Sequence, residues 1–275
     1  MSDVATGRRG SVRVTSLHAF VDVPSGVADH SAAFWGAVTG WPAGPPWRDH
    51  PELRSLLPPR GTAWLHVQEV DDAPRVHIDL EVPCGDAAHD VADQEVERLR
   101  SLGATFVRST DDWVTLASPG GLPFCVPGCE TAAGARAGAS WPEPTTWRDG
   151  HRSRVRQICV DIPAGRWEAE TTFWTAATRW RPEQTGRGPG ESGRPEFSWL
   201  RPPAGPQQVL LQRMDEPSGV VRAHLDVATD DVAAEVRRVR DLGAGQHAAD
   251  TRHDGRWVVL RDPAGLAFCI TPQRP

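Results

Sequence analysis

The chain contains no lysine, no asparagine and no tyrosine, so each of its 30 basic residues is an arginine. These absences exclude several kinds of chemistry. Without lysine there is neither a Schiff-base nucleophile nor the phosphate-loop lysine of nucleotide-binding proteins, and without tyrosine there is no phenolic acid. Any proton transfer must therefore fall to histidine, aspartate, glutamate or cysteine.

Long apolar segments are also absent. No run approaches the roughly 20 residues that a membrane span needs, and the first residues lack the apolar core of a secretion signal. The 5 cysteines are an odd number and are scattered, which does not indicate a disulfide framework. A net charge of −6, with arginines dispersed among acids, argues against a nucleic-acid surface. We therefore expect a cytoplasmic protein with no membrane and no nucleic-acid partner.

The same pattern of residues occurs twice along the 275 residues of the chain. In the first half it comprises His18–Pro24, Phe34–Trp35, His77–Asp79, Leu102–Ala104 and Pro119–Cys125, and in the second half Gln157–Pro163, Phe173–Trp174, His224–Asp226, Leu242–Ala244 and Pro263–Cys269. A repeat that keeps its order over this length indicates a duplicated folding unit. We predict one domain over residues 12–127, a linker over 128–153 that is rich in Ala, Gly, Pro and Thr, and a second domain over 154–272.

Each copy alternates between strand and helix patterns. Residues 17–23 alternate so that His18, Phe20 and Asp22 share one face of a predicted strand. Residues 28–39 fit a helix that ends at Gly40, residues 63–70 and 75–82 fit strands, and residues 87–102 fit a second helix. Short strands near residue 106 and over 113–117 and 123–126 complete the first copy, and a helix over 231–242 belongs to the second. The Pro-rich stretch 42–60 is either a stiff connection or the rim of a cleft.

This order predicts an α+β fold. Four β-α-β-β-β modules pair into two tandem domains, each with a curved mixed sheet whose apolar face is covered by helices. The polar face of each sheet then borders a cleft. His18 and His77 lie on equivalent strands of paired modules, so we expect their rings to face that cleft.

The sequence resembles the vicinal oxygen chelate superfamily, which includes glyoxalase I, bleomycin-resistance proteins and extradiol dioxygenases, and it is most similar to the glyoxalase-like branch. The resemblance rests on the segments Phe34–Trp41, Val76–Leu80, Leu102–Ala104, Ser118–Cys125 and Asp262–Cys269. It covers nearly the whole chain outside the linker and the termini. It implies two tandem domains of the fold just described, but the superfamily includes isomerases, dioxygenases, thiol transferases and ligand-sequestering proteins.

The resemblance also implies a metal-ligand set. Metal-using relatives carry ligands on the first and last strands of paired modules, which correspond here to His18, Gln68, His77 and Cys125. The second copy offers Gln157, Gln212, His224 and Cys269 less convincingly. The relatives usually have glutamate on the last strands, where this chain has Gln68 and Cys125. The implied cofactor is one divalent metal, Zn, Ni, Mn or Fe, and replacement of a carboxylate by a thiol makes dioxygenase chemistry an unfavourable interpretation.

Two interpretations stay open for the repeated His77-Ile-Asp79 and His224-Leu-Asp226 triplets. Histidine and aspartate two residues apart on one strand face either brace each other in the scaffold or serve metal binding and proton transfer. His18 points more strongly to function, because the second copy has Gln157 in its place. The paired cysteines Cys125 and Cys269 are either small buried core residues or ligands.

Aromatic residues supply a candidate substrate surface. Tryptophan occurs 12 times against 7 phenylalanines. Trp35 and Trp174 fit the apolar faces of helices, whereas Trp47, Trp64 and Trp113, with Phe20, are candidates to line the cleft and stack on a planar ligand.

The leading functional hypothesis is a lyase or isomerase that works mainly in the first copy on a small molecule with vicinal oxygens. His18 and His77 would hold a metal that lowers the pKa of an adjacent C–H bond, and Asp79 or Glu81 would move the proton. On this hypothesis His18→Ala abolishes metal binding. The alternative is a metal-free protein that sequesters an aromatic molecule, in the manner of drug-resistance relatives. Either protein is expected to be a monomer or a homodimer.

Overall fold

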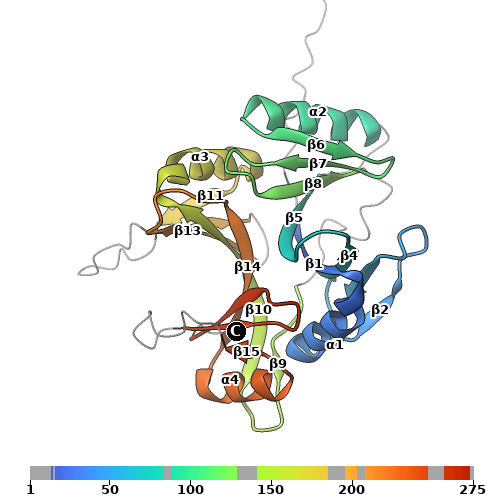
Figure 1. Cartoon of the computed structure of the whole chain (residues 1–275), viewed down its shortest axis with the longest axis vertical. Helices are drawn as coiled ribbons and strands as arrows, with labels where there is room; N and C mark the ends of the chain where they lie inside the picture. Colours follow the sequence, from blue (N-terminus) through green and yellow to red (C-terminus); the bar gives the residue numbers. More distant parts are fainter. Residues whose placement is uncertain are drawn as a thin grey trace, which may run out of the picture.

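The computed structural model describes residues 14, 16–82, 88–128, 141–184, 196–202, 208–246 and 257–272. It contains two mixed sheets and four α-helices, arranged as four successive β-α-β-β-β modules (Figure 1). The first module comprises β1 (Ser16–Pro24), α1 (Ala28–Thr39), β2 (Ala43–Pro46), β3 (Leu53–Leu56) and β4 (Leu65–Val70), and the second β5 (Arg75–Glu81), α2 (Ala88–Ser101), β6 (Thr105–Ser109), β7 (Trp113–Ala117) and β8 (Pro123–Pro127). The third comprises β10 (Arg152–Pro163), α3 (Trp167–Thr178), β11 (Arg181–Gln184), β12 (Phe197–Arg201) and β13 (Gln208–Met214), and the fourth β14 (Arg222–Thr229), α4 (Val232–Asp241), β15 (Gly245–Gln246), β16 (Val258–Arg261) and β17 (Ala267–Thr271). The predicted module order and fold class are therefore confirmed.

Two modules join side by side to make each sheet. The first sheet has the strand order β2-β3-β4-β1-β5-β8-β7-β6, and the second has the matching order β11-β12-β13-β10-β14-β17-β16-β15. The first strands of paired modules, β1 and β5, are antiparallel neighbours at the centre. Among the described residues the edge strands of each sheet do not pair with each other, so neither sheet closes into a barrel. This centre is where side chains from two modules meet.

The local sequence accounts for these elements. Along β1 the residues Leu17, Ala19 and Val21 are fully buried in the core, while the alternate residues face the other side of the sheet. Helix α1 ends where predicted, because Gly40 adopts a left-handed conformation with φ of 73° that L-residues with a side chain disfavour. Helix α4 begins at Asp231, whose carboxylate accepts a hydrogen bond of 2.9 Å from the backbone N–H of Ala234.

Two segments differ from expectation. The Pro-rich stretch 42–60 forms the hairpin β2–β3 and not merely a stiff connection. Pro45 and Pro46 fall in its edge strand β2, which does not need every N–H donor. Within the predicted linker, β9 (Thr145–Thr146) pairs with the beginning of β10. Residues 12 and 13, the helix start at Ala87 and residues 129–140 of the linker lie outside the described residues, as do Cys84 and Cys129. The other three cysteines are buried and free of disulfides.

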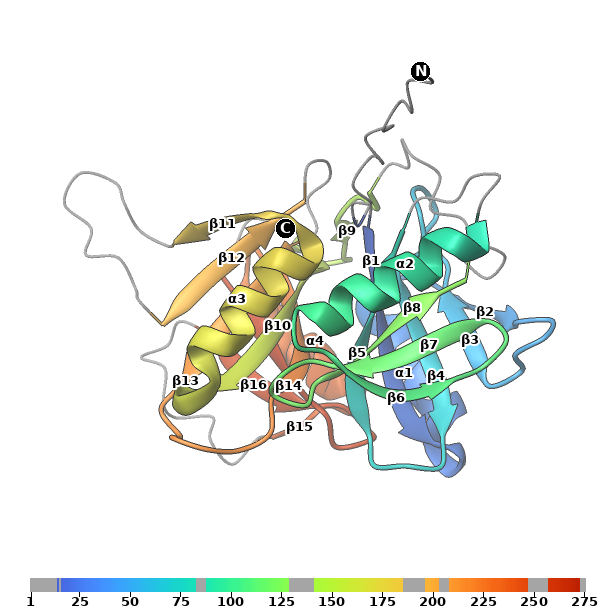
Figure 2. The same cartoon turned by 90° about the horizontal axis from the view of Figure 1, so that it is seen from above.

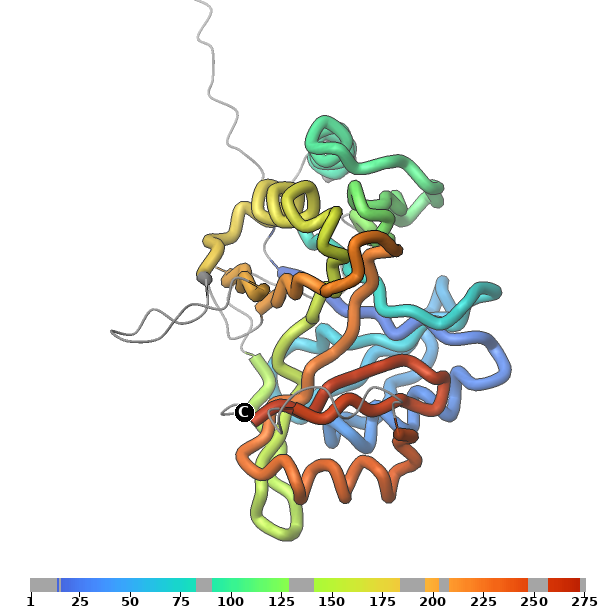
Figure 3. Tube along the Cα trace, turned by 60° about the vertical axis from the view of Figure 1, so that its left-hand side comes forward, coloured from blue at the N-terminus to red at the C-terminus, as the bar shows by residue number. Residues whose placement is uncertain are grey.

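The two domains share one apolar core. Helix α1 lies beside the fourth module and helix α3 beside the second, so the blue segment and the orange-red segment are neighbours, as are the green and yellow segments (Figure 3). Figure 2 shows α3 next to α2 from above. Trp35 of α1 contacts Phe268 with ring centroids 5.3 Å apart, and Trp174 of α3 contacts Phe124 at 5.4 Å. Both tryptophans are almost completely buried, as their helix positions predict.

Arginines fix this arrangement from the opposite domain. Arg98 of α2 donates to the carbonyls of Ala176 and Ala177, and Arg238 of α4 donates to those of Ala37 and Val38. The unpaired carbonyls at the end of a helix carry partial negative charge, so a guanidinium stabilises each helix end. In the described part of the chain, no helix has both the length and the apolar character that a bilayer crossing requires.

A buried histidine links the β9–β10 turn to α4. His151 Nε2 lies 2.7 Å from Glu235, and Nδ1 also contacts Asp149. Burial lowers the pKa of His151, but hydrogen bonds to Glu235 and Asp149 outweigh burial and leave the pKa above its ordinary value. A raised pKa in the folded state stabilises the fold fully below the unfolded-state pKa, and the contribution is lost as pH rises through the folded-state pKa.

We therefore expect His151→Gln to lower stability more at pH 6 than at pH 9. Urea unfolding midpoints of the wild type and the variant, measured at both values, test this expectation. A gap between the two proteins that widens with rising pH would contradict it.

Candidate active site in the first domain

A hollow opens on the face of the first sheet that lies away from the core. It holds about 740 Å³ of space free of atoms, open solvent at its mouth included. Strands from both modules line it, because β1 and β5 run side by side at its centre. The residues that line this hollow include His18, Phe20, Asp22, Trp47, Gln68, Arg75, His77, Asp79, Glu81, Arg108, Trp113, Thr115 and Cys125.

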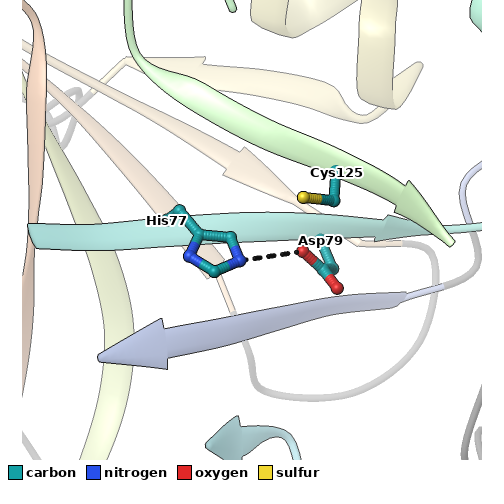
Figure 4. A group of neighbouring side chains, drawn as sticks. All are labelled: His77, Asp79 and Cys125. Carbon is teal, nitrogen blue, oxygen red and sulfur yellow. Dashed lines mark ion pairs between the residues drawn. The ribbon is translucent and has the colours of Figure 1, made fainter. Parts of the chain in front are cut away.

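His77 occupies the centre of one cluster in this hollow. Its Nδ1 lies 2.7 Å from Asp22 Oδ1 on β1, and its Nε2 lies 3.3 Å from Asp79 Oδ1 on β5. Cys125 on β8 is the register partner of Asp79, which brings its thiol to the same point (Figure 4). Single ligand atoms of His77, Asp79 and Cys125 all lie within 4.8 Å of one another. The three residues thus offer a nitrogen, an oxygen and a sulfur to one position.

These three residues fit a divalent metal. Asp79 Oδ1 is buried and makes no hydrogen bond, and its contact with His77 Nε2, at 3.3 Å, is an ion pair only when His77 is protonated. With a neutral His77, an oxygen that is costly to bury unpaired therefore faces the ligand position. Asp22 accepts the Nδ1–H of His77, which directs the Nε2 lone pair of the neutral ring toward that position. Metal-ligating histidines in proteins commonly donate their other ring N–H to a carboxylate in this way. Imidazole, carboxylate and thiolate together suit Zn²⁺, Ni²⁺ or Fe²⁺ better than the hard cations.

Protons compete for the same position. Burial lowers the pKa of His77, but the negative charge of Asp22 and hydrogen bonds to Asp22, Asp79 and Cys125 leave it well above the ordinary value. Burial also raises the pKa of the Cys125 thiol, and the charge of Asp79 adds to the effect. A bound metal must therefore displace one proton from His77 and one from Cys125.

His18 belongs to a second cluster. Its Nδ1 lies 2.8 Å from His66 Nε2, and its Nε2 lies 3.6 Å from Glu81. His66 Nδ1 in turn lies 3.0 Å from Ser55 Oγ, which accepts a 3.0 Å hydrogen bond from Trp47 Nε1–H. The first and last members of this chain, Trp47 and Glu81, both line the hollow.

One ring of this hydrogen-bond chain is neutral. Burial, together with the neighbouring charges of His18 and His77, holds the pKa of His66 well below its ordinary value, so this ring carries no charge. A neutral imidazole donates from one nitrogen and accepts at the other, so His66 links Ser55 to His18 in either of its two tautomers. His18 Nε2 faces Glu81. The carboxylate of Glu81 also accepts a short hydrogen bond from Ser16.

Aromatic rings wall the hollow. Phe20 stacks between His66 and His77, with centroid distances of 4.5 and 4.8 Å, and Trp47 meets Phe20 edge-on at 6.4 Å. Trp113 lies on the other side, on β7. Arg75 donates a hydrogen bond of 3.0 Å to Asp22. The exposed Arg108 also lines the hollow. The surface therefore combines flat apolar walls with a polar floor.

The structure brings together most of the side chains that the sequence indicated. His18, Gln68, His77 and Cys125 all line one hollow, with Asp79, Glu81, Phe20, Trp47 and Trp113. The four expected ligands do not form one group, because Phe20, the register partner of His77, stands between the His77 and His66 clusters. Trp64 lies elsewhere, buried next to Trp41 and Trp141.

Several residues of the hollow were not singled out from the sequence. Asp22 lies on the same strand face as His18, so the alternation of residues along β1 could have identified it as a residue of the hollow. His66 lies two residues before Gln68 on β4, so the same alternation places both on one face. Ser55 and Arg108 carried no such signal, because they come from the hairpin β2–β3 and the edge strand β6, whose positions depend on tertiary structure.

The second domain repeats the histidine cluster with one change. His224 contacts Asp161 through Nδ1 and Asp226 through Nε2, both at 3.2 Å, and Cys269 Sγ lies 3.4 Å from Nε2. Asp226 Oδ1, like Asp79 Oδ1, is buried with no hydrogen-bond partner. Cys159 stands where the first domain has Phe20, and burial raises its pKa.

In place of the chain of His18 and His66, the second domain has amide side chains. Gln208 donates to Gln157 at 2.5 Å, Gln157 donates to Asp226, and the Cys159 thiol contacts Gln212 at 3.3 Å. Gln157 stands at the position of His18, and Leu210 stands at the position of His66, so the second domain has no titratable imidazole at either place. The two copies thus share the histidine cluster and differ in the residues that could move a proton.

A family profile with the description "Glyoxalase-like domain" matches residues 18–127 and 157–271, which are the two sheets described above. The chain belongs to the glyoxalase-like domain family. Both halves match separately, so the glyoxalase-like unit is duplicated within this one chain, and its place in the wider superfamily of vicinal oxygen chelate proteins is confirmed. A search of curated protein sequences gives no match.

Solved structures share the fold of this glyoxalase-like protein. The Mn(II)-bound glyoxalase from Novosphingobium aromaticivorans matches with a TM-score of 0.58 at 16% identity, over 95% of this chain and 83% of that one. The 2,3-dioxygenase LapB from Pseudomonas sp. KL28 matches with a TM-score of 0.54 at 14% identity, over 92% and 90%. An extradiol ring-cleaving dioxygenase from B. fuscum matches with a TM-score of 0.55 at 13% identity, over 96% and 73%. At these identities the likeness concerns the fold alone.

Proposed function

We propose that this glyoxalase-like protein is a metal-assisted enzyme of lyase or isomerase type, acting in the hollow of the first domain. The observation that carries the proposal is the cluster of His77, Asp79 and Cys125, in which Asp22 orients the imidazole and a buried oxygen of Asp79 makes no hydrogen bond. The superfamily includes metal-dependent enzymes, among them the Mn(II)-bound glyoxalase named above. The expected cofactor is one divalent ion in this domain, Zn, Ni, Mn or Fe, of which the thiolate disfavours Mn.

The geometry separates the two carboxylates that the sequence left as equal candidates for proton transfer. Asp79 lies beside His77 and Cys125 and serves as a ligand, whereas Glu81 lies beside His18 at the end of the hydrogen-bond chain. A metal in this position supplies Lewis acidity toward two neighbouring substrate oxygens. Glu81 accepts the proton from the carbon next to those oxygens and returns it to the adjacent carbon. Ser16, which donates a hydrogen bond to Glu81, and His18, whose Nε2 lies 3.6 Å away, orient the carboxylate during the transfer.

The shape of the hollow limits the substrate. Phe20, Trp47 and Trp113 favour a molecule with a flat apolar group, and Arg108 favours a polar or anionic end. We therefore propose a small aromatic α-hydroxycarbonyl compound as the substrate class. The protein is expected to act in the cytoplasm and to be a monomer or a homodimer.

Hydrogen exchange tests the proposed reaction without knowledge of the natural substrate. The protein is placed in D₂O and supplied with Zn²⁺, Ni²⁺, Mn²⁺ or Fe²⁺. We expect the wild type to catalyse the exchange of hydrogen for deuterium in 2-hydroxyacetophenone, at the carbon that bears the hydroxyl group and adjoins the carbonyl. NMR measures the rate of this exchange. Glu81→Gln should lower the rate roughly 10²- to 10⁴-fold, the usual contribution of a positioned acid or base. Glu97→Gln, an exposed change on α2, is the matched control.

An exchange rate that is the same in Glu81→Gln as in the wild type would contradict the role of Glu81. Absence of exchange with every metal, in a protein whose metal content has been verified, would contradict the proposed activity on this substrate class.

The second candidate function is metal-free sequestration of an aromatic molecule. The specific observation in its favour is that a protonated His77, braced between Asp22 and Asp79, satisfies the polar floor without a metal. The aromatic walls are then the functional surface. Quenching of tryptophan fluorescence by aromatic compounds in metal-free protein, lost in Trp47→Leu, supports this function, and silence across a broad panel excludes it.

A further inference from the structure

A threonine hydroxyl lies beside the sulfur of the metal-ligand cluster. Thr115 on β7 is the antiparallel register partner of Cys125 on β8, and its Oγ1 lies 3.4 Å from Cys125 Sγ. Both side chains line the hollow of the first domain. On the other side of Cys125, the register partner is Asp79 on β5, and Figure 4 shows these two residues side by side. Cys125 thus has a carboxylate of the cluster on one neighbouring strand and a hydroxyl on the other.

The Thr115 hydroxyl has its hydrogen-bond partner in this sulfur. Thr115 is buried, and within the part of the chain that the structure describes its Oγ1 makes a hydrogen bond only with Cys125. A neutral thiol is a weak acceptor, whereas a thiolate carries a charge and accepts strongly. A thiolate has no proton to donate, so in contact with an ionised Cys125 the donor is the O–H of Thr115. The contact therefore suits the form of Cys125 that binds a metal.

The second domain lacks this hydroxyl. Val259 on β16 lies opposite Cys269 on β17, in the register that Thr115 and Cys125 have in the first domain. Valine and threonine are both β-branched and differ by one methyl group in place of the hydroxyl. The repeat therefore folds with either residue at this position, and packing does not require the O–H. A role at the Cys125 sulfur accounts for the threonine of the first domain.

We propose that Thr115 is a positioning residue of the metal site, whose O–H donates to the ionised Cys125 sulfur and holds it toward the point that it shares with His77 and Asp79. This inference rests on the proposed function, because it requires a metal bound through Cys125. Groups that hydrogen-bond to a ligand change metal affinity although they do not touch the metal, and hydrogen bonds at a ligating sulfur tune the electronic properties of the site.

The experiment compares Co²⁺ binding by the full chain with threonine, valine or serine at position 115. Every protein also carries His224→Ala, so that the equivalent cluster of the second domain does not contribute. Thr115→Val introduces the residue of the second domain and should weaken Co²⁺ binding roughly tenfold, measured by competition with a chelator. It should also move the thiolate-to-metal absorption band to longer wavelength, because a sulfur without its hydrogen bond gives up electron density more easily.

Two variants show whether the O–H is responsible. Thr115→Ser keeps the hydroxyl and should retain both the affinity and the band position of the parent protein. Thr105→Val removes an exposed hydroxyl from β6, outside the hollow, and should also behave as the parent does. Urea unfolding midpoints check that each variant is folded.

The outcomes separate this inference from the proposed function. A parent protein with a thiolate-to-metal band, together with unchanged affinity and band position in Thr115→Val, would overturn the role of Thr115 and leave the metal site standing. Equal losses in Thr115→Val and Thr115→Ser would also overturn that role, since packing at position 115 would then explain the effect. Absence of a thiolate-to-metal band in the parent would overturn both the inference and the metal site on which it rests.

Discussion

Replacement of His77 by alanine should remove the metal ion of the first domain and, with it, deuteration of 2-hydroxyacetophenone. His77 is the only one of the three clustered ligands that Asp22 orients, so its loss leaves Asp79 and Cys125 without a nitrogen ligand. Asp22→Asn keeps the ligand and removes the negative charge of the group that orients it, and changes of this kind weaken metal binding roughly 10- to 100-fold. Metal content after dialysis and the thiolate-to-metal absorption of Co²⁺-loaded protein measure both effects.

Two control variants make this result specific. His224→Ala changes the equivalent histidine of the second domain and should leave the exchange reaction intact, whatever metal the second domain holds. His18→Ala distinguishes the two ligand sets: the set implied by family resemblance requires His18, whereas the cluster in the structure does not include it. Loss of metal in His18→Ala with retention in His77→Ala would contradict the assignment made here.

Arg238→Ala should cause the largest loss of stability among changes outside the core. Its guanidinium pairs with Glu235, which is fully buried, donates to the carbonyls at the end of α1, and lies 3.5 Å above the ring of Trp147. Truncation breaks this buried ion pair and leaves Glu235 with His151 as its remaining charged partner; breaking a buried pair costs about 3–5 kcal/mol in comparable sites. Urea unfolding followed by tryptophan fluorescence measures the loss of free energy of unfolding.

The same helix provides the control for this prediction. Arg237→Ala removes an exposed arginine one position away and should change the free energy of unfolding by less than about 0.5 kcal/mol. Equal effects of the two substitutions would mean that Arg238 does not hold the two domains together.

The duplication explains how the second domain differs in chemistry. Both copies have aspartate, histidine, aspartate and cysteine at equivalent positions. The histidine cluster is therefore a feature that the two copies share. Only the first copy adds His18 and His66 and leaves Phe20 as a flat wall. The residues proposed here for proton transfer (His18, His66 and Glu81) and the wall residue Phe20 therefore differ between the copies, whereas Trp113 has a counterpart in Trp257.

The alternation of apolar and polar residues, the helix stop at Gly40 and the repeated segments were enough to predict the modules, their order and the faces of β1 and β5. They also placed His18, His77, Asp79 and Glu81 on the polar side of their strands, whereas Cys125 was left open between a buried core residue and a ligand. These are local properties, because the direction of a side chain from a strand or a helix follows from its position in a short repeat.

Which of those side chains meet was decided only by tertiary structure. The register between β1 and β5 puts Phe20, and not His18, opposite His77, and the pairing of β5 with β8 puts Cys125 beside Asp79. The crossing of helices between domains depends on contacts between residues far apart in the chain. A strand pattern fixes a face, but a shift of one residue in pairing or a different turn changes every neighbour on that face, so local sequence could not select the partners.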